Sequence, residues 1–347
     1  MSVRAHRPTP LGQCRGLTAP CLAALLLLVV VGCASKRGGA GASAGEDAEE
    51  DADAPDAEPW LKRRLLPTVL STRGAAPTSP GELSLAPGME RVRYPSSTRE
   101  GELSLLAVVA APRRAPETAD TVAARLPAIL LLHSGYALDA EHLGWAQPFV
   151  DAGFLVMLPT WRGENGNPGS FELLAGEVDD ARAAGRWLAS EPDVDVDRLY
   201  LFGHGTGGSL AALLALDPDL PFRKIGAASA VTTATTFLAW QREDPARVPF
   251  DPRNPLEQRR RALLPNAHEL AQPLILYAGE DDALGLRDAR RVQERAPDRV
   301  ELVPVPGDAT TAASAALQRF LTIVLADAGA TPVAATWRPA ASSRSAP

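Results

Sequence analysis

Cysteine and histidine are scarce in this sequence, and both shortages restrict the chemistry it can perform. The 347 residues include three cysteines, none of them beyond Cys33, and five histidines. The chain after Cys33 therefore cannot form internal disulfides, cysteine-ligated zinc sites or iron-sulfur clusters, and it has no cysteine nucleophile. The histidines lack metal-ligand spacing such as H-E-x-x-H, so we expect no metal site and no cofactor.

Aromatic residues are also few, at 5%, but 46% hydrophobic and 22% charged residues suffice for a full core. This composition excludes a chain that is disordered or fibrous throughout. The formal net charge is -7, and eight carboxylates gather between Glu46 and Glu58. No basic block or stripe stands out, which argues against a nucleic-acid partner.

Residues 1–32 have the pattern of an export signal. An arginine-containing start precedes an uncharged run, 16–32, which is shorter than the roughly 20 residues of a membrane-spanning helix. The run ends in VVGC at residues 30–33, and this resembles the lipobox of bacterial lipoproteins. The resemblance implies cleavage before Cys33, acylation of Cys33 and attachment to the cell envelope, at the outer membrane. An ordinary secretory signal is the alternative.

The rest of the chain divides by composition. Residues 33–59 are predicted to form an acidic Gly/Ala linker, because they offer almost nothing to bury. Residues 60–88 are Pro-rich and irregular. A folded domain is expected over 89–328, with a lid-like insertion at 232–267, and residues 329–347 are expected to be a disordered tail.

Short apolar runs alternate with helical patterns through the folded part. Two leading strands, Glu90–Tyr94 and Gly101–Ala111, are expected to form an antiparallel hairpin with its turn at Pro95–Glu100, and one helix is expected over Ala140–Ala152. Later alternation predicts an α/β fold with a mostly parallel, twisted sheet of about eight strands and helices on both faces. Further strands are expected at 127–133, 154–158, 198–202, 225–231, 273–278 and 300–305, and helices at 177–190, 206–215, 285–296 and 310–328.

A glycine-rich turn, GHGTGG at 203–208, joins one of these strands to a small-residue helix. This arrangement resembles the nucleophile elbow of α/β-hydrolases, whose nucleophile stands at the centre of a G-x-S-x-G turn. The resemblance covers about Glu90 to Ala328 and is greatest for the prolyl oligopeptidase and dienelactone hydrolase branches. Three segments resemble motifs of that serine peptidase group: R-G-x-x-G at Arg162–Gly166, D-x-x-R at Asp195–Arg198 and G-x-x-D at Gly279–Asp282.

The resemblance fails at two catalytic positions. Gly205 stands where the family has Ser, Cys or Asp, and glycine has no side chain that could attack a carbonyl. The resemblance places the catalytic histidine in the loop 306–311, yet no histidine follows His268. Without an imidazole, no group takes the proton of a nucleophile. Of the triad only the acid remains, at Asp282, with its two acidic neighbours as alternatives.

Neighbouring groups are not expected to replace the missing nucleophile. The backbone N–H of Thr206 is expected to help form an oxyanion hole while its side chain points away, and Ser209 lies inside the helix. The other oxyanion donor would come from the loop Ser134, Gly135 and Tyr136, which resembles the family's H-G segment with serine in place of glycine. Loss of both nucleophile and base costs about 10⁶ in turnover.

These features favour a membrane-anchored lipoprotein whose prolyl oligopeptidase-like domain is not catalytic and acts by binding a ligand or protein. The crevice at the carboxyl ends of the strands would take a small ester, acyl or peptide ligand, with Trp161 and Arg162 beside Tyr136. One alternative is an active serine hydrolase or peptidase that uses unrecognised residues. Another is an interaction protein that binds through residues 232–267.

Overall fold

A computed structural model describes residues 58–78, 83–112 and 124–329. The predicted export signal, Cys33, nearly all of the acidic linker and nearly all of the C-terminal tail lie outside these residues. Within the described ranges, no helix combines the length and the apolar character that crossing a membrane requires.

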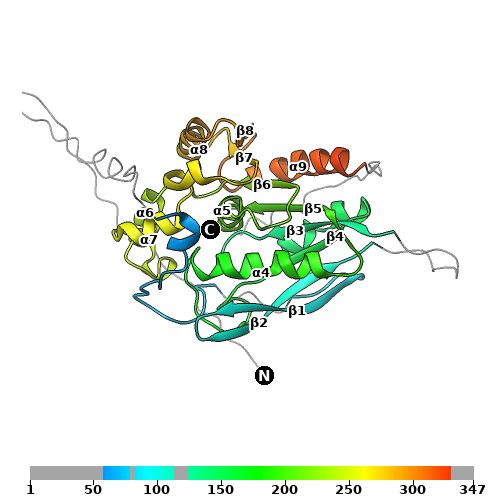
Figure 1. The fold of residues 1–347 in the computed structure, drawn as a ribbon, viewed down its shortest axis with the longest axis horizontal. Helices are drawn as coiled ribbons and strands as arrows, with labels where there is room; N and C mark the ends of the chain where they lie inside the picture. Colours follow the sequence, from blue (N-terminus) through cyan, green and yellow to red (C-terminus); the bar gives the residue numbers. More distant parts are fainter. Residues whose placement is uncertain (1–57, 79–82, 113–123, 330–347) are drawn as a thin grey trace, which may run out of the picture. The chain divides into compact units, whose positions relative to one another are not determined.

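The described residues form one sheet of eight strands in the order β1-β2-β4-β3-β5-β6-β7-β8 (Figure 1). The strand β2 is antiparallel to both β1 and β4, whereas every neighbouring pair from β4 to β8 is parallel. This topology confirms the predicted mostly parallel sheet with an antiparallel leading pair. The strands are β1 (Met89–Thr98), β2 (Gly101–Ala110), β3 (Leu126–Leu132), β4 (Leu155–Pro159), β5 (Val194–His204), β6 (Lys224–Ala228), β7 (Leu274–Gly279) and β8 (Val300–Val305).

Helices cover both faces of the sheet. Along β3, Leu130 and Leu132 belong to one hydrophobic cluster, while Ile129 and Leu131 belong to the other, because successive side chains of a strand point to opposite faces. The first cluster includes residues of α4, α5 and α8, and the second includes residues of α3 and α9. The helices are α1 (Trp60–Arg63), α2 (Ala140–Gly144), α3 (Gln147–Asp151), α4 (Gly176–Ser190), α5 (Thr206–Leu214), α6 (Thr235–Glu243), α7 (Pro255–Arg261), α8 (Ala283–Arg295) and α9 (Ala312–Ala328), with 3-10 turns at Pro245–Arg247 and Leu264–Glu269.

Several predicted element bounds are wrong, and a proline explains two of them. The strand expected at 225–231 ends at Ala228, and the strand expected at 198–202 runs from Val194 to His204. The turn expected at Pro95–Glu100 is shorter, since β1 continues through Pro95 and pairs with β2 as far as Thr98. Proline is tolerated there because β1 is an edge strand. The helix expected over Ala140–Ala152 is two short helices, α2 and α3, because Pro148 has no N–H to continue the first and instead lies in the first turn of the second.

The start of the described chain packs against the aromatic and charged stretch after β6. Trp60 is fully buried. Its indole N–H donates to the carbonyl of Arg260 (2.9 Å), and its backbone N–H donates to the Glu269 carboxylate (2.7 Å). In the same stretch, Phe237 and Phe250 are buried in the first hydrophobic cluster. Residues 60–78 and the predicted insertion therefore pack against each other.

Candidate functional site

The turn between β5 and α5 has the backbone geometry of a nucleophile elbow. The strand ends at His204, the helix begins at Thr206, and Gly205 alone joins them with φ 58° and ψ -118°. This region of backbone space is almost closed to residues with a side chain and costs them about 1–3 kcal/mol. The central position therefore keeps the strained turn while the side chain that would use it is absent.

The glycines around this position are required for different reasons. A Cβ at Gly203 would lie 2.1 Å from the carbonyl oxygen of Gly207, and a Cβ at Gly207 would lie 2.3 Å from the carbonyl oxygen of Leu132. A Cβ at Gly205 would meet only Ser134, whose Cβ would be 3.1 Å away. Packing thus requires glycine at 203 and 207, whereas backbone conformation and Ser134 disfavour a side chain at 205.

The loop between β8 and α9, where the family places its base, is held by hydrogen bonds of its own. The Asp308 carboxylate accepts from the backbone N–H groups of Thr310 (2.9 Å) and Thr311 (2.8 Å). The carbonyl of Ala309 lies 3.0 Å from Nε2 of His204, and burial lowers the pKa of that imidazole. The nearest histidine to this loop therefore contacts its backbone, with its ring buried on the strand side of the elbow.

Asp282, the predicted remnant of the triad, begins helix α8. Its carboxylate accepts a hydrogen bond from the backbone N–H of Gly285 (2.9 Å), so it acts as the N-cap of that helix. A capping carboxylate of this kind stabilises a helix by about 0.5–2 kcal/mol without any catalytic partner. The contacts of Asp282 therefore describe a structural role at the family's acid position.

The loop after β3 lies directly beside the elbow. Thr206 donates its hydroxyl to the carbonyl of Gly135 (2.8 Å), which ties the start of α5 to this loop. Tyr136 contacts the ring of Phe171 edge-on at 5.4 Å and accepts a hydrogen bond from Arg247 (2.9 Å). The predicted oxyanion residues therefore lie together, and Tyr136 connects them to the stretch after β6.

Three residues of this loop region form a chain of contacts that sequence reasoning missed. The hydroxyl of Ser134 lies 3.0 Å from Nε2 of His142, and Nδ1 of His142 lies 2.8 Å from a carboxylate oxygen of Asp139. The Asp139 carboxylate also caps α2. The close contact with His142 lowers the pKa of Asp139 to about 2, and burial lowers the pKa of His142. The available signal was D-x-x-H on the first turn of a helix, just after Ser134.

Two of the residues predicted to line the crevice are largely engaged elsewhere. Trp161 is buried and stacks on His133 with ring centroids 5.5 Å apart. Arg162 is buried against Asp180, to which its Nε and Nη2 donate at 3.0 and 2.7 Å. A paired guanidinium of this kind fixes the loop after β4 in place.

A buried histidine and carboxylate brace the same loop. Nε2 of His133 lies 3.2 Å from Oε2 of Glu164, and both side chains are almost completely buried. Burial alone would lower the pKa of His133, but the neighbouring Glu164 carboxylate raises it above its ordinary value. Since the pair is enclosed, it stabilises the loop rather than presenting a reactive group.

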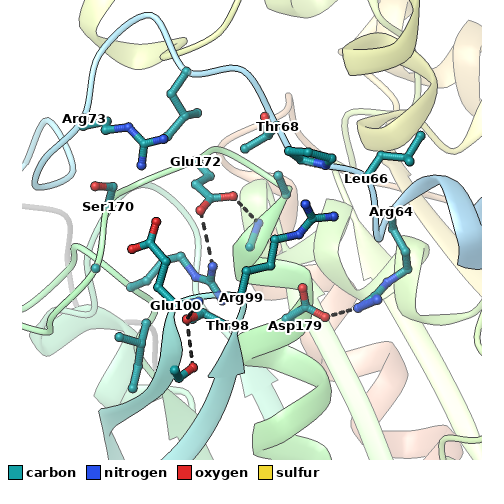
Figure 2. A pocket seen from close by; sticks show the side chains of 18 of the residues that line it. Arg64, Leu66, Thr68, Arg73, Thr98, Arg99, Glu100, Ser170, Glu172 and Asp179 are labelled. Carbon is teal, nitrogen blue, oxygen red and sulfur yellow. Dashed lines mark hydrogen bonds and ion pairs between the residues drawn. The ribbon is translucent and has the colours of Figure 1, made fainter.

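A cavity of about 480 Å³ is lined by residues of the β1–β2 turn, such as Arg99, and of the start of α4, such as Asp179. Figure 2 shows these two residues beside it. Two ion pairs form part of its wall, Arg64 with Asp179 and Arg162 with Glu172. The segment that follows α1 closes another side, through residues such as Thr68. The cavity is therefore lined by charged groups from segments far apart in the sequence.

Four further charged residues of this cavity have no partner among the described residues. They are Arg73, Arg99, Glu100 and Glu102, and none makes an ion pair or a side-chain hydrogen bond within those ranges. Figure 2 shows Arg73, Arg99 and Glu100 around the same space. The unpaired groups thus offer two cations and two anions. In the described part of the chain, no group of three His, Cys, Asp or Glu side chains is placed to hold a metal ion.

The strand order, the β5–α5 turn and the helices on both faces define an α/β-hydrolase domain. Residues 142–284 match the Prolyl oligopeptidase family. The domain is therefore a prolyl oligopeptidase-like α/β-hydrolase domain, as the sequence motifs predict.

Curated relatives match parts of the chain. The uncharacterized peptidase YtmA of Bacillus subtilis is 35% identical over 69 residues, which cover 20% of this chain and 27% of the relative. An uncharacterized protein of Mycobacterium tuberculosis is 27% identical over 188 residues, which cover 52% of this chain and 62% of the relative. The chain thus spans between about a quarter and two thirds of the length of these relatives.

Solved structures share the fold at low sequence identity. A puromycin-hydrolyzing peptidase of Mycobacterium tuberculosis is 19% identical with a TM-score of 0.54, over 70% of this chain and 40% of that chain. The fluorophosphonate-binding serine hydrolase FphF of Staphylococcus aureus is 16% identical with a TM-score of 0.53, over 68% of this chain and 98% of that chain. At this identity the likeness concerns the fold alone.

Proposed function

We propose that this protein is a lipid-anchored envelope protein whose prolyl oligopeptidase-like domain has lost the hydrolytic mechanism of the family and acts by binding a ligand. The observation that carries the proposal is the absence of catalytic groups at the elbow and in the loop after β8. Gly205 keeps the strained turn but has no nucleophile. The loop 306–311 has no imidazole, and Asp282 caps a helix. Two of the three groups that the mechanism requires are missing together.

Restoring the nucleophile alone is expected to restore no activity. The Gly205→Ser variant should hydrolyse esters and amides at the rate of Gly205→Ala, because the imidazole of His204 faces Ala309 and that of His142 is in contact with Ser134. Both variants should lose about 1–3 kcal/mol of stability from the strained backbone. Steady-state assays and urea unfolding of the two proteins measure this. A gain of 100-fold or more in Gly205→Ser over Gly205→Ala would contradict the proposal.

The charged cavity supports ligand binding and indicates a ligand class. Its volume of about 480 Å³ lies within the range of about 300–1,000 Å³ typical of small-molecule sites. Arg73 and Arg99 can pair with a carboxylate, while Glu100 and Glu102 can pair with an ammonium group. A short peptide with free termini carries both charges. We therefore propose a zwitterionic peptide as the ligand.

A peptide titration tests this ligand class. Trialanine with free termini is expected to raise the melting temperature, because saturation to 100 times Kd adds about 2.7 kcal/mol of stability. N-acetyl-trialanine amide, which lacks both charges, should have no effect. The Arg99→Ala variant should lose the response, whereas Arg287→Ala, which removes an exposed arginine paired with Asp288 outside the cavity lining, should keep it. An unchanged melting temperature with trialanine would remove the support for a peptide ligand.

The proposed anchor requires Cys33, so its replacement gives a direct test. Two or more acyl chains hold a protein stably on a membrane, since burial contributes about 0.8 kcal/mol per methylene. Cells that express the full chain with Cys33→Ser should release it from the membrane fraction and incorporate no labelled palmitate. The Cys21→Ser variant should stay membrane-bound and labelled. Labelling that persists in Cys33→Ser would contradict the anchor.

A second candidate function is acyl transfer by residues other than those of the family. One specific observation favours it, the contact of the Ser134 hydroxyl with His142 at 3.0 Å. This contact lies beside the elbow but does not depend on Gly205 or on the loop 306–311.

A further inference from the structure

Ser134 lies beside the space that the family's nucleophile would occupy. Its Cβ would be only 3.1 Å from a Cβ built on Gly205. The sequence places serine here in a segment where the related enzymes have glycine, and the structure leaves the residue partly exposed. Compared with the related enzymes, this chain lacks a side chain at 205 and has an additional one at 134. Both positions border the same small volume next to the elbow.

The imidazole beside Ser134 is placed to act as a base. Nε2 of His142 lies 3.0 Å from the Ser134 hydroxyl and 3.3 Å from its backbone N–H. Since Nε2 has donors on this side, the ring proton belongs on Nδ1, which lies 2.8 Å from Asp139. The ring packs against Trp145 at 4.8 Å and His133 at 5.5 Å. Its environment thus keeps the imidazole neutral and its free nitrogen directed at a hydroxyl.

The carboxylate completes the order of groups found in a serine triad. Asp139 remains ionised at neutral pH because its pKa is about 2. Its oxygen is in contact with Nδ1 of His142 without the alignment of a hydrogen bond. Catalytic hydrogen bonds are often loosely aligned before substrate binds. The carboxylate can therefore fix the ring and stabilise the imidazolium that forms during reaction.

The start of α5 supplies donors for a developing negative charge. The backbone N–H of Thr206 is the first of that helix and has no acceptor among the described residues. The hydroxyl of Thr206 donates to the carbonyl of Gly135 (2.8 Å), so the start of α5 is held against the loop that carries Ser134. The first N–H groups of a helix favour a negative charge. An oxyanion formed on a carbonyl bound between Ser134 and Thr206 would be stabilised there.

We infer that Ser134, His142 and Asp139 form a displaced triad that transfers acyl groups from activated esters to Ser134. The Ser134 oxygen attacks the carbonyl carbon while its proton passes to Nε2 of His142. The tetrahedral intermediate then collapses, the bond from carbon to the leaving oxygen breaks, and the leaving group takes the proton from His142. The products are acyl-Ser134 and a free alcohol, and a water activated in the same way releases the acid. This reaction goes beyond ligand binding and requires no nucleophile at Gly205.

A fluorophosphonate probe tests the displaced triad, because it labels a serine only when a neighbouring base removes its proton. The purified chain from Cys33 onward should form one adduct, with loss of fluoride, on the peptide that contains Ser134. The Ser134→Ala variant should lose labelling, and His142→Gln should slow it by about 10²–10⁴-fold. Ser190→Ala, which removes an exposed serine at the end of α4 and outside the charged cavity, should label like the unaltered protein.

Controls separate reactivity from folding and from ligand binding. Ser134→Cys should form a thioester with a p-nitrophenyl ester, while its melting temperature stays that of the unaltered chain. A probe adduct on another residue, labelling that survives in Ser134→Ala, or no labelling of the folded protein would each overturn the displaced triad. The trialanine titration reads out binding separately, so either proposal can fail while the other stands.

Discussion

Replacing Glu257 with alanine is expected to lower the free energy of unfolding by about 3–5 kcal/mol, because a buried cation loses its partner. Glu257 and Arg261 are one turn apart on α7, and both side chains are almost completely buried in contact with each other. Arg261 also donates to the carbonyls of Leu173 (2.6 Å) and Glu172 (3.0 Å). This arginine connects the stretch after β6 to the loop before α4. Leaving its buried charge unpaired should therefore lower the stability of the whole domain.

An exposed pair with the same spacing provides the control. Glu243 and Arg247 are also four residues apart, but the Glu243 side chain is 65% exposed. Removal of Glu243 should cost about 0–1 kcal/mol, the range of a surface ion pair. Urea unfolding of Glu257→Ala and Glu243→Ala measures both values. Equal losses in the two variants would contradict the role given to the buried pair.

Substitution of Gly207 by alanine is expected to cost about 3 kcal/mol, the upper end of typical overpacking. The added Cβ would lie 2.3 Å from the carbonyl oxygen of Leu132 and 2.5 Å from that of His133. Both obstacles are backbone atoms, so neither can move aside as a flexible side chain would. The helix α5 would have to shift away from β3, and this should disturb the loop that carries Ser134.

Gly144 offers a matched substitution without this obstacle. Nothing lies within 4 Å of a Cβ built there, and the residue is in helix α2. Gly144→Ala should therefore be neutral or stabilising by about 0.5–1 kcal/mol, because alanine loses less backbone entropy. Thermal unfolding compares the two proteins. If Gly207→Ala has the same melting temperature as Gly144→Ala, close packing at the elbow is not the reason for glycine at 207.

The fold could be predicted from sequence because its signals are local. Apolar runs such as Pro127–His133 and the glycines at 203 and 207 mark a buried strand and a tight strand-to-helix turn, whatever surrounds them. The structure places a strand and such a turn there. The bounds at Pro95 and Pro148 were wrong because a proline is tolerated at a sheet edge and at a helix start, and sequence alone does not reveal which strand is an edge.

The candidate sites depend on contacts that the sequence pattern does not contain. Ser134 was recognised as part of the oxyanion-like loop, but its contact with His142 depends on how the loop folds back after β3. The charged cavity brings Arg73 and Arg99 together from separate segments. Arg162 was expected beside a ligand, yet its position is fixed by Asp180, whose burial the helical pattern alone does not specify.

Cleavage of alanyl-alanine p-nitroanilide by the purified chain from Cys33 onward tests the central claim, that the elbow no longer performs the family's reaction. Working enzymes typically turn over at about 1–10³ s⁻¹. We predict no release of nitroaniline above the uncatalysed rate, in the unaltered protein and in Ser134→Ala alike. Turnover at 1 s⁻¹ or faster that persists in Ser134→Ala would contradict this account.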